Sequence, residues 1–263
     1  MNFYWVYDLP EWAFCALMTM TAIAVSSGGV LLTRSPARRL FGQNGMNEMV
    51  SYFLTLTGVF YGITLGLIAV GAWETYTSAS DKVSHEAASL ATICQDVHLL
   101  PEGPEKTKLN EALKAFTRHV IDEDWPPQRE GQLPKGGTAS LEAVIKSVML
   151  LDTQTEMDRI VAAQIYSRLN NLIEQRRLRL ESVGSGIPAL LYWVVVIGGL
   201  INISVTWCFV MESTFAHVIL SGVSGALIGL LIFMVAAMDH PFRGEYSIGP
   251  DAFEIVFDRY FGS

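Results

Sequence analysis

Charge is missing from four long stretches of this 263-residue sequence. The windows without Asp, Glu, Lys or Arg contain 22 to 30 residues each, and they cover residues 12–33, 49–73, 182–211 and 213–238. A soluble domain interleaves charged and apolar residues at helical or strand period, so windows of this length exclude a soluble enzyme. They match the helix length that crosses a bilayer core about 30 Å thick. A transmembrane barrel is also excluded, because its strands alternate over about ten residues and keep one polar face.

Reactive side chains are also few. Cys15, Cys94 and Cys208 lie too far apart in the sequence for a disulfide framework or a metal site. The His85-Glu86 pair lacks the second histidine of a zinc-protease helix, and phosphate-binding glycine loops and nucleophile elbows are absent. We therefore predict no catalysis, no nucleic-acid partner and no resident cofactor, apart from the calcium ion considered below.

The charge pattern predicts an all-α membrane protein with four transmembrane helices and an all-helical extramembrane insert between the second and third. The expected spans are Trp12–Thr33, Met49–Trp73, Ile187–Val210 and Ser213–Met238. The first is too long for the apolar region of a secretion signal, so we expect it to be retained. The resulting divisions are a first helix pair (1–73), the insert (74–181), a second pair (182–238) and an interfacial tail (239–263). Because the number of spans is even, both termini and the insert should lie on one side.

The insert carries 13 Lys and Arg against 17 Asp and Glu, and its apolar residues recur at helical steps. Its first helix should continue the second span as far as Leu100, because no proline or glycine interrupts the sequence there. Further helices are expected at Glu105–Asp122, Ser140–Leu151 and Thr155–Arg179, with a loop rich in proline and glycine from Pro126 to Gly137. The insert should therefore be a small helical bundle.

Small residues recur every four positions in two spans. The stripes are Gly58, Gly62 and Gly66 in the second span, and Ser221, Gly225 and Gly229 in the fourth. This period permits the close backbone contact by which helices associate in lipid. The two stripes could pair with each other inside one chain, or at least one could be an interface between subunits. The second interpretation predicts a homo-oligomer.

The second span also carries hydroxyls, from Thr55, Thr57 and Thr64, among bulky apolar residues. Membrane hydroxyls commonly bond to their own helix backbone. The alternative is the wall of a narrow, mostly apolar pore that is controlled by its radius and by dewetting. A transporter is less favoured, because only His217 and Pro188 suggest an intramembrane ionisable site or a broken helix.

Two charged clusters of the insert have two interpretations each. The acidic run Asp122–Asp124 is either a solvated helix end or the site of a hard cation such as calcium, with Glu123 and Asp124 as candidate ligands. The basic run Arg176–Arg179 is either a membrane flank that contacts anionic headgroups or part of a vestibule that attracts anions.

A short motif follows the fourth span. Pro241 should end the helix, with Asp239 at the membrane interface and Arg243 close enough in sequence to pair with it or with Glu245. Phe242 offers an apolar anchor just before Gly244. We expect the motif to fix the exit of the last span against the insert, unless it is an ordinary surface turn.

Five motifs lie along the chain from the second span to the tail. They are Phe60-Tyr61-Gly62, Trp73-Glu74-Thr75-Tyr76, Glu123-Asp124-Trp125, the run Arg176-Arg177-Leu178-Arg179-Leu180 before Ile187-Pro188, and Asp239-His240-Pro241-Phe242-Arg243-Gly244. Together they resemble the bacterial bestrophin-like membrane proteins over nearly the whole chain. The last motif is the most specific of the five.

The resemblance implies a pentameric, mainly anion-conducting channel whose second span lines an apolar neck. Carried onto this chain, the neck is Leu56, Phe60 and Thr64, with Tyr52 one turn above. This neck departs from the family pattern, since it has one bulky aromatic residue and Thr64 is polar. Bestrophins also bind calcium through acidic residues, which the acidic run of the insert does not match. The resemblance implies anions as the permeant ions, whereas the acidic insert would favour cations, and both stay open.

Arginines near two different loops give opposing signals for sidedness. Arg34, Arg38 and Arg39 favour a cytoplasmic first loop, while the arginines near the third span and in the tail favour a cytoplasmic insert. The resemblance and the free Cys94 favour the cytoplasmic insert. We predict a homo-oligomeric ion channel of the bacterial inner membrane, with lipid, copies of itself and inorganic ions as partners. The competing prediction is a non-conducting membrane scaffold or sensor whose insert docks a protein partner.

Overall fold

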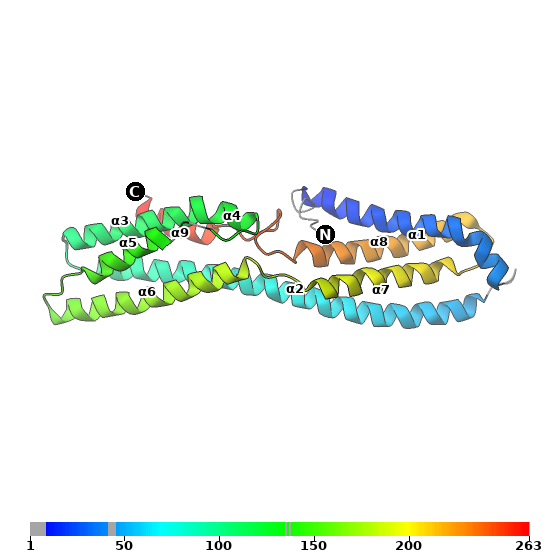
Figure 1. The fold of residues 1–263 in the computed structure, drawn as a ribbon, viewed down its shortest axis with the longest axis horizontal. Coiled ribbons are helices and arrows are strands. Elements are labelled where there is room, and N and C mark those ends of the chain that lie inside the picture. The colour runs from blue at the N-terminus through cyan, green and yellow to red at the C-terminus, as the bar shows by residue number, and fades with distance from the viewer. Residues whose placement is uncertain (1–8, 42–45, 135, 137, 263) are drawn as a thin grey trace. The chain divides into compact units, whose positions relative to one another are not determined.

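The computed structural model describes residues 9–41, 46–134, 136 and 138–262, and these residues form helices and turns without a strand (Figure 1). This architecture confirms the predicted all-α fold class. The chain divides into two compact units, described in turn below. The membrane unit contains residues 1–75 and 186–239, and the second unit contains residues 76–185 and 240–263.

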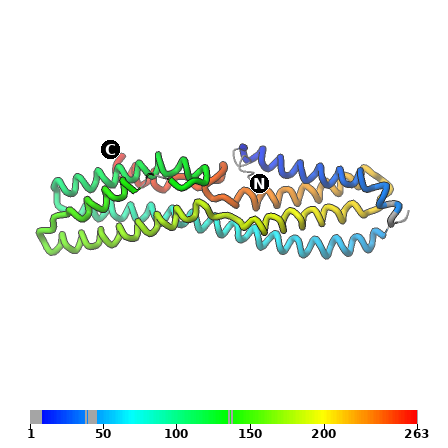
Figure 2. The backbone as a smooth tube through the Cα atoms, in the orientation of Figure 1, coloured from blue at the N-terminus to red at the C-terminus, as the bar shows by residue number. Residues whose placement is uncertain are grey.

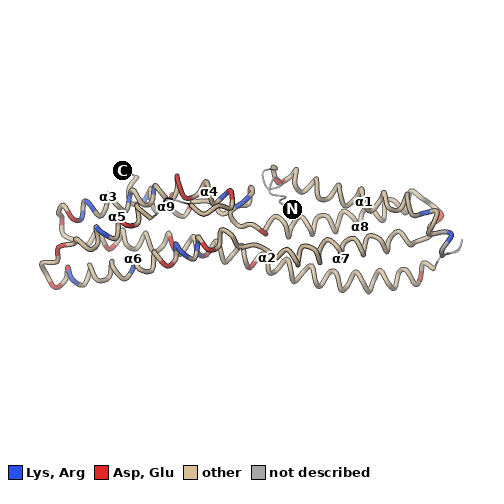
Figure 3. The backbone as a smooth tube through the Cα atoms, in the orientation of Figure 1, with Lys and Arg blue, Asp and Glu red and all other residues tan. Residues whose placement is uncertain are grey.

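Among the residues that the structure describes, four helices are long and apolar enough to cross a membrane, as predicted. They are α1 (Glu11–Phe41), the first part of α2 (Asn47–His98), α7 (Ala189–Trp207) and α8 (Thr214–Ala237). Figure 3 shows long uncharged stretches along these helices, with charged positions near their ends. The helix α1 continues beyond the predicted limit at Thr33, whereas α7 and α8 lie within their predicted spans.

The membrane unit is held by small apolar clusters. Leu65 and Ile68 of α2 cluster with Val195 of α7 and Val235 of α8. At the start of α2, the amide of Asn47 bonds to both backbone groups of Val210, with each N···O distance 2.8 Å. Most other apolar side chains of the spans point outward, as a lipid environment permits.

The helix α2 is uninterrupted over 52 residues. This confirms the prediction that the second span continues beyond Trp73. Its sequence contains no proline, and it ends shortly before Pro101 and Pro104, which cannot continue a helix without losing backbone bonds. One helix therefore supplies both a membrane span and a part of the second unit.

The second unit is a helical bundle with one continuous apolar core. Besides the end of α2 it contains α3 (Pro104–His119), α4 (Trp125–Arg129), α5 (Thr138–Met149), α6 (Glu156–Ser182) and α9 (Asp251–Phe261). The helix α6 begins with a capping box in which Thr155 and Asp158 bond reciprocally. The bonds from Thr155 lower the pKa of the Asp158 carboxyl below its ordinary value, because they favour the ionised form.

The predicted loop from Pro126 to Gly137 starts too early. After α3 the chain makes a π-helical turn, Val120–Asp124, and continues into α4. Pro126 and Pro127 lie in the first turn of α4, where a proline is tolerated because the N–H groups have no intrahelical partner. Gly137 lies outside the described residues.

Candidate functional site

One face of the α2 span packs on its own chain. Leu65 and Ile68 keep only 2% and 8% of their surface exposed. Tyr61 packs against the same apolar cluster, and its hydroxyl donates a hydrogen bond to the carbonyl of Val195 at 3.2 Å. Even so, only 11% of the most apolar window of α2 is buried, against 33% for α8. Of these two spans, α2 is therefore the one that offers more surface to lipid, to a pore or to other subunits.

The predicted neck residues lie on an outward row of α2. Tyr52, Leu56 and Phe60 keep 68%, 53% and 65% of their surface exposed, and Thr64 is exposed as well. They follow each other at four-residue steps, so the row winds slowly around the helix. The structure thus brings the four residues together on one surface that their own chain leaves uncovered.

The hydroxyls of the second span bond to their own helix. Thr55, Thr57 and Thr64 each donate to the carbonyl four residues earlier, at 2.9, 2.9 and 2.8 Å. This is the geometry that the structural interpretation predicts. Along the outward row, therefore, the hydroxyl proton of Thr64 is already used, and the row carries no charge.

The small-residue stripe of α8 packs on α1 of the same chain. Figure 2 shows the backbones of these two helices side by side. A Cβ added at Gly225 would lie 2.7 Å from the carbonyl oxygen of Ala22, and one at Gly229 would lie 2.8 Å from Cα of Thr19. Ser221 of the stripe places its Oγ 2.7 Å from Oγ of Ser26. The interpretation that the two stripes pair with each other is therefore wrong, because α1 occupies this one.

The glycine stripe of α2 lies on a different and open surface. A Cβ added at Gly62 or Gly66 would meet nothing within 4 Å, and one at Gly58 would only touch Oδ1 of Asn202 at 3.7 Å. Within the described chain this stripe has space for larger side chains. The open space at Gly62 and Gly66 is sufficient for lipid or for another helix.

The acidic and basic runs of the insert meet in the core of the second unit. Asp124 is fully buried, and its Oδ2 accepts a hydrogen bond from Nη1 of Arg176 at 2.6 Å. Arg179, also fully buried, pairs with Glu86 and donates from Nη1 to Oε1 of Gln128 at 2.7 Å. A solvated helix end at Asp124 and a lipid-facing flank at Arg176 and Arg179 are both wrong, since these groups face one another away from solvent.

The candidate calcium ligands are engaged by side chains of the insert itself. Oε2 of Glu123 lies 3.1 Å from Nδ1 of His119, and Oδ1 of Asp124 lies 3.6 Å from Nε2 of the same ring. Among the residues that the structure describes, no three His, Cys, Asp or Glu side chains are grouped so as to hold a metal ion. Calcium at Glu123 and Asp124 gains no support from this geometry.

The motif after the last span is anchored by Phe242 in the second unit. Phe242 is 1% exposed, and its ring centroid lies 6.2 Å from that of Trp125. The backbone turns at Gly244, whose φ of +85° favours glycine, and the carbonyl of Pro241 accepts a bond from the N–H of Ile248 at 2.8 Å.

The two charged residues of this motif, Asp239 and Arg243, are considered separately. In the membrane unit, Asp239 accepts a hydrogen bond from the backbone of Ile187. The predicted pairing of Arg243 with Asp239 stays a prediction.

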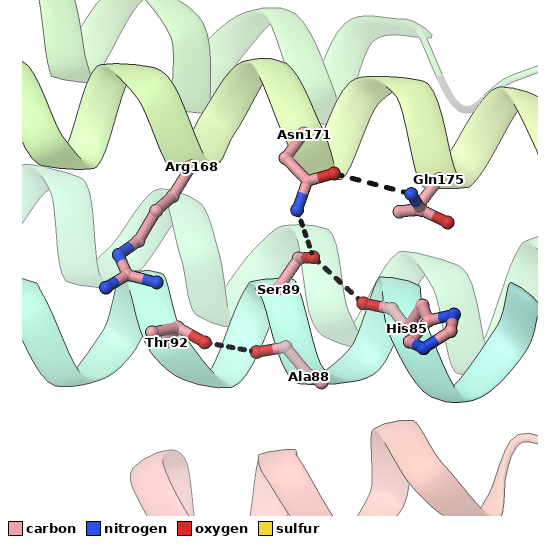
Figure 4. Close-up of a pocket in the computed structure, with 7 residues that line it drawn as sticks. All are labelled: His85, Ala88, Ser89, Thr92, Arg168, Asn171 and Gln175. Carbon is pink, nitrogen blue, oxygen red and sulfur yellow. Dashed lines mark hydrogen bonds between the residues drawn. The ribbon is translucent and has the colours of Figure 1, made fainter.

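A groove of about 290 Å³ lies between α2 and α6 in the second unit (Figure 4). It is lined by His85, Ala88, Ser89, Thr92, Arg168, Asn171 and Gln175. Ser89 donates to the carbonyl of His85 at 2.8 Å and accepts from Nδ2 of Asn171 at 3.2 Å. Nε of Arg168 lies 2.6 Å from a carboxylate oxygen of Asp96. Because its polar groups largely bond one another, the groove presents no catalytic constellation.

Sequence reasoning missed three residues of these sites. Glu86 is 93 residues from Arg179, and no spacing rule connects them. Gln128 follows two prolines and therefore looked like part of a loop. Tyr61 was noted only as part of a motif. It lies 12 residues from either end of the window 49–73, and this is a signal that its hydroxyl needs a partner inside the bilayer.

Comparisons with known proteins agree with this architecture. A family model described as the bestrophin-like domain matches residues 20–253. Two crystal structures of a bacterial bestrophin homolog from Klebsiella pneumoniae, each with one substitution, are similar with TM-scores of 0.68 and 0.65. Each is 11% identical in sequence, and the match covers 93% of this chain and 99% of theirs. No curated protein matches the sequence. At such low identity these structures show a shared fold.

Proposed function

Because this multi-pass membrane protein belongs to the bestrophin-like domain family, we propose that it forms a homo-oligomeric ion channel, a pentamer, in which α2 of every subunit lines the pore. The observation that carries the proposal is the outward row Tyr52, Leu56, Phe60 and Thr64. Its own chain leaves this row uncovered, and the row is uncharged, as the wall of a narrow apolar neck would be. Conduction would be passive.

The residues of α2 divide among three directions, which supports this arrangement. Successive helix positions differ by about 100°, so Leu65 and Ile68 point close to the direction of Tyr61. On the same basis, Gly62 lies about 100° to one side of Tyr61 and Phe60 about 100° to the other. Contact with its own chain, contact with a neighbouring subunit and contact with a pore therefore use separate faces of α2.

The uncharged row would control ion passage by its radius and its wetting. A narrow apolar constriction excludes water, and with it ions, until it widens. Such a neck does not by itself select the sign of the ion. The family resemblance favours anions and the acidic balance of the insert favours cations, so the flux assay below is run with chloride and with potassium.

Phe60→Ala tests the pore directly. We expect the variant to conduct more than the wild type in liposome flux and planar-bilayer recordings, because removing the ring widens and wets the neck. Val223→Ala is the matched control, since Val223 is similarly exposed but lies on α8, which is not proposed to line the pore. It should leave the flux unchanged.

The same recordings distinguish the channel from the competing function, a non-conducting scaffold or sensor. If wild type and Phe60→Ala are both silent at every calcium concentration and voltage, the pore is refuted and the scaffold is favoured. A dimer, or a ring with no water path along its axis, would also refute conduction. The exposed, uncharged row on α2 favours the channel over the scaffold, so we retain the channel as the proposal.

We further propose the bacterial inner membrane as the location, with the insert and both termini in the cytoplasm. In a chain in which Cys15 and Cys208 are replaced by serine, the variant Gly103→Cys places a thiol between α2 and α3, in the second unit. Burial raises the pKa of Cys94 to about 12, so this native thiol should not react. In intact cells an impermeant thiol reagent should leave Gly103→Cys unlabelled, and it should label this variant once the cells are opened. Labelling of intact cells would reverse the orientation.

A further inference from the structure

Tyr61 of α2 is seated in a notch of α7 made by two consecutive glycines. A Cβ added at Gly198 would lie 2.7 Å from Cδ2 and 2.9 Å from Cε2 of the Tyr61 ring. One added at Gly199 would lie 3.0 Å from the Tyr61 hydroxyl oxygen and 3.2 Å from Cγ2 of Ile228 on α8. A methyl group at Gly198 would clash with the ring, and one at Gly199 would require the Tyr61 hydroxyl and Ile228 to shift by a few tenths of an ångström. The ring therefore occupies the space that the two glycines leave.

A directional bond fixes the ring in this notch. The Tyr61 hydroxyl donates to the carbonyl of Val195 at 3.2 Å, one turn before Gly199. Within a bilayer a phenol without an acceptor is costly, because no water is available to replace the bond. Rotation of α2 away from α7 would break this bond and expose the hydroxyl to lipid. Ring shape and hydrogen bond therefore favour the same orientation.

Asn47 provides the second directional contact of the span with the α7–α8 pair. Its side-chain amide exchanges two hydrogen bonds with the backbone of Val210, at 2.8 Å each. The residue lies 14 positions before Tyr61, which corresponds to about 21 Å along the helix. The other contacts of this face, Leu65 and Ile68, are apolar and tolerate sliding. Two directional contacts at different heights fix both the position and the rotation of the span.

We propose that Tyr61 is a positioning residue of the pore, which holds α2 at the rotation that turns Phe60 and Thr64 away from their own chain. The role rests on the proposed function, since it needs α2 to line a pore. Phe60 precedes Tyr61 directly, so its direction differs from the notch by about 100°. A change in the seating of the ring is thus transmitted to the neck without any intermediate element.

The rotation of α2 can be measured by the reactivity of thiols at two adjacent positions. Phe60→Cys and Val59→Cys are introduced separately into a full-length chain in which Cys15 and Cys208 are replaced by serine. A water-soluble thiol reagent is added to the reconstituted protein. With Tyr61 in place, Phe60→Cys should react faster than Val59→Cys. With Tyr61→Leu, which fills similar volume without ring or hydroxyl, the two rates should become similar.

Tyr61→Phe is the conservative control. It keeps the ring in the notch and should largely preserve the ratio of the two rates. A residue that only stabilised the fold would lower the melting temperature in Tyr61→Leu without changing the ratio, and that result overturns the positioning role. If Tyr61→Leu does not fold, Gly198→Ala displaces the ring instead and must give the same convergence.

The outcomes separate this role from the channel itself. If Phe60→Cys reacts and the ratio of the two reaction rates is unchanged in Tyr61→Leu and Gly198→Ala, the positioning role of Tyr61 is wrong. The pore hypothesis is not affected by that result. If the water-soluble reagent never reacts with the thiol of Phe60→Cys, the pore hypothesis is wrong. The positioning role of Tyr61 is then wrong as well. Convergence of the rates, with the ratio kept in Tyr61→Phe, supports both.

Discussion

Replacing Arg179 by Gln should lower the free energy of unfolding by about 3–5 kcal/mol, the usual cost of removing one partner of a buried ion pair. Arg179 is fully buried, and it pairs with the carboxylates of Glu86 and Asp124. Without the guanidinium, Glu86 would remain fully buried without a counter-charge. Desolvation of that carboxylate, and not the loss of attraction alone, sets the size of the effect.

The surroundings of Arg179 leave little room for relaxation. Its guanidinium carbon lies 5.0 Å from the ring centroid of Trp125 and 5.8 Å from that of Phe253, so aromatic rings cover the site. Water therefore cannot readily replace the lost hydrogen bonds. Adding Glu86→Gln to Arg179→Gln should recover part of the stability, because the double variant removes the unpaired charge as well as its partner.

Arg177 is the matched control, two positions away on the same helix. It is exposed and pairs with Glu181 at 2.8 Å, an arrangement that raises the pKa of the guanidinium. Surface pairs of this kind contribute little, so Arg177→Gln should leave thermal unfolding in detergent unchanged. The tryptophan fluorescence of the chain measures the thermal unfolding of both variants. Equal melting temperatures for Arg177→Gln and Arg179→Gln would contradict the buried network.

The spans and the continuity of α2 could be predicted because single, local constraints determine them. A bilayer admits only long uncharged helices. For most of the helix ends, the end of the charge-free window therefore lies within a few residues of the observed one. The absence of proline and glycine between Trp73 and Pro101 predicted the long helix in the same way. The predicted loop started too early at Pro126, because a proline is as compatible with the first turn of a helix as with a loop.

The pairings could not be predicted, because they join residues that are distant in sequence. Asp124 and Arg176 are 52 positions apart, and in isolation each run looked like a solvated or lipid-facing cluster. The partner of the α8 stripe left a weak signal. Thr19, Ala22 and Ser26 are themselves small residues at three- and four-residue steps in the first span. A search for matching stripes across all spans would have included α1 as a partner for α8.

Enlarging a glycine should have opposite consequences in the two stripes. Gly225→Leu should destabilise the chain by about 3 kcal/mol or more, at the upper end of overpacking costs, because the nearest atom to its Cβ is a backbone oxygen of α1. Backbone cannot move aside as a flexible side chain can. Thermal unfolding of the detergent-solubilised chain measures this loss, and a wild-type melting temperature would contradict the α1–α8 contact.

Gly62→Leu should leave the fold of the single chain intact and abolish its assembly. Nothing in the described chain lies within 4 Å of the new Cβ, so no contact inside the subunit opposes the larger side chain. A neighbouring helix that approaches the glycine stripe closely would be pushed away, since such packing depends on small residues. Native mass spectrometry should therefore show wild-type oligomers and Gly62→Leu monomers of unchanged melting temperature. Intact oligomers of Gly62→Leu would mean that subunits associate through another face of α2, and the assignment of its three faces would have to be revised.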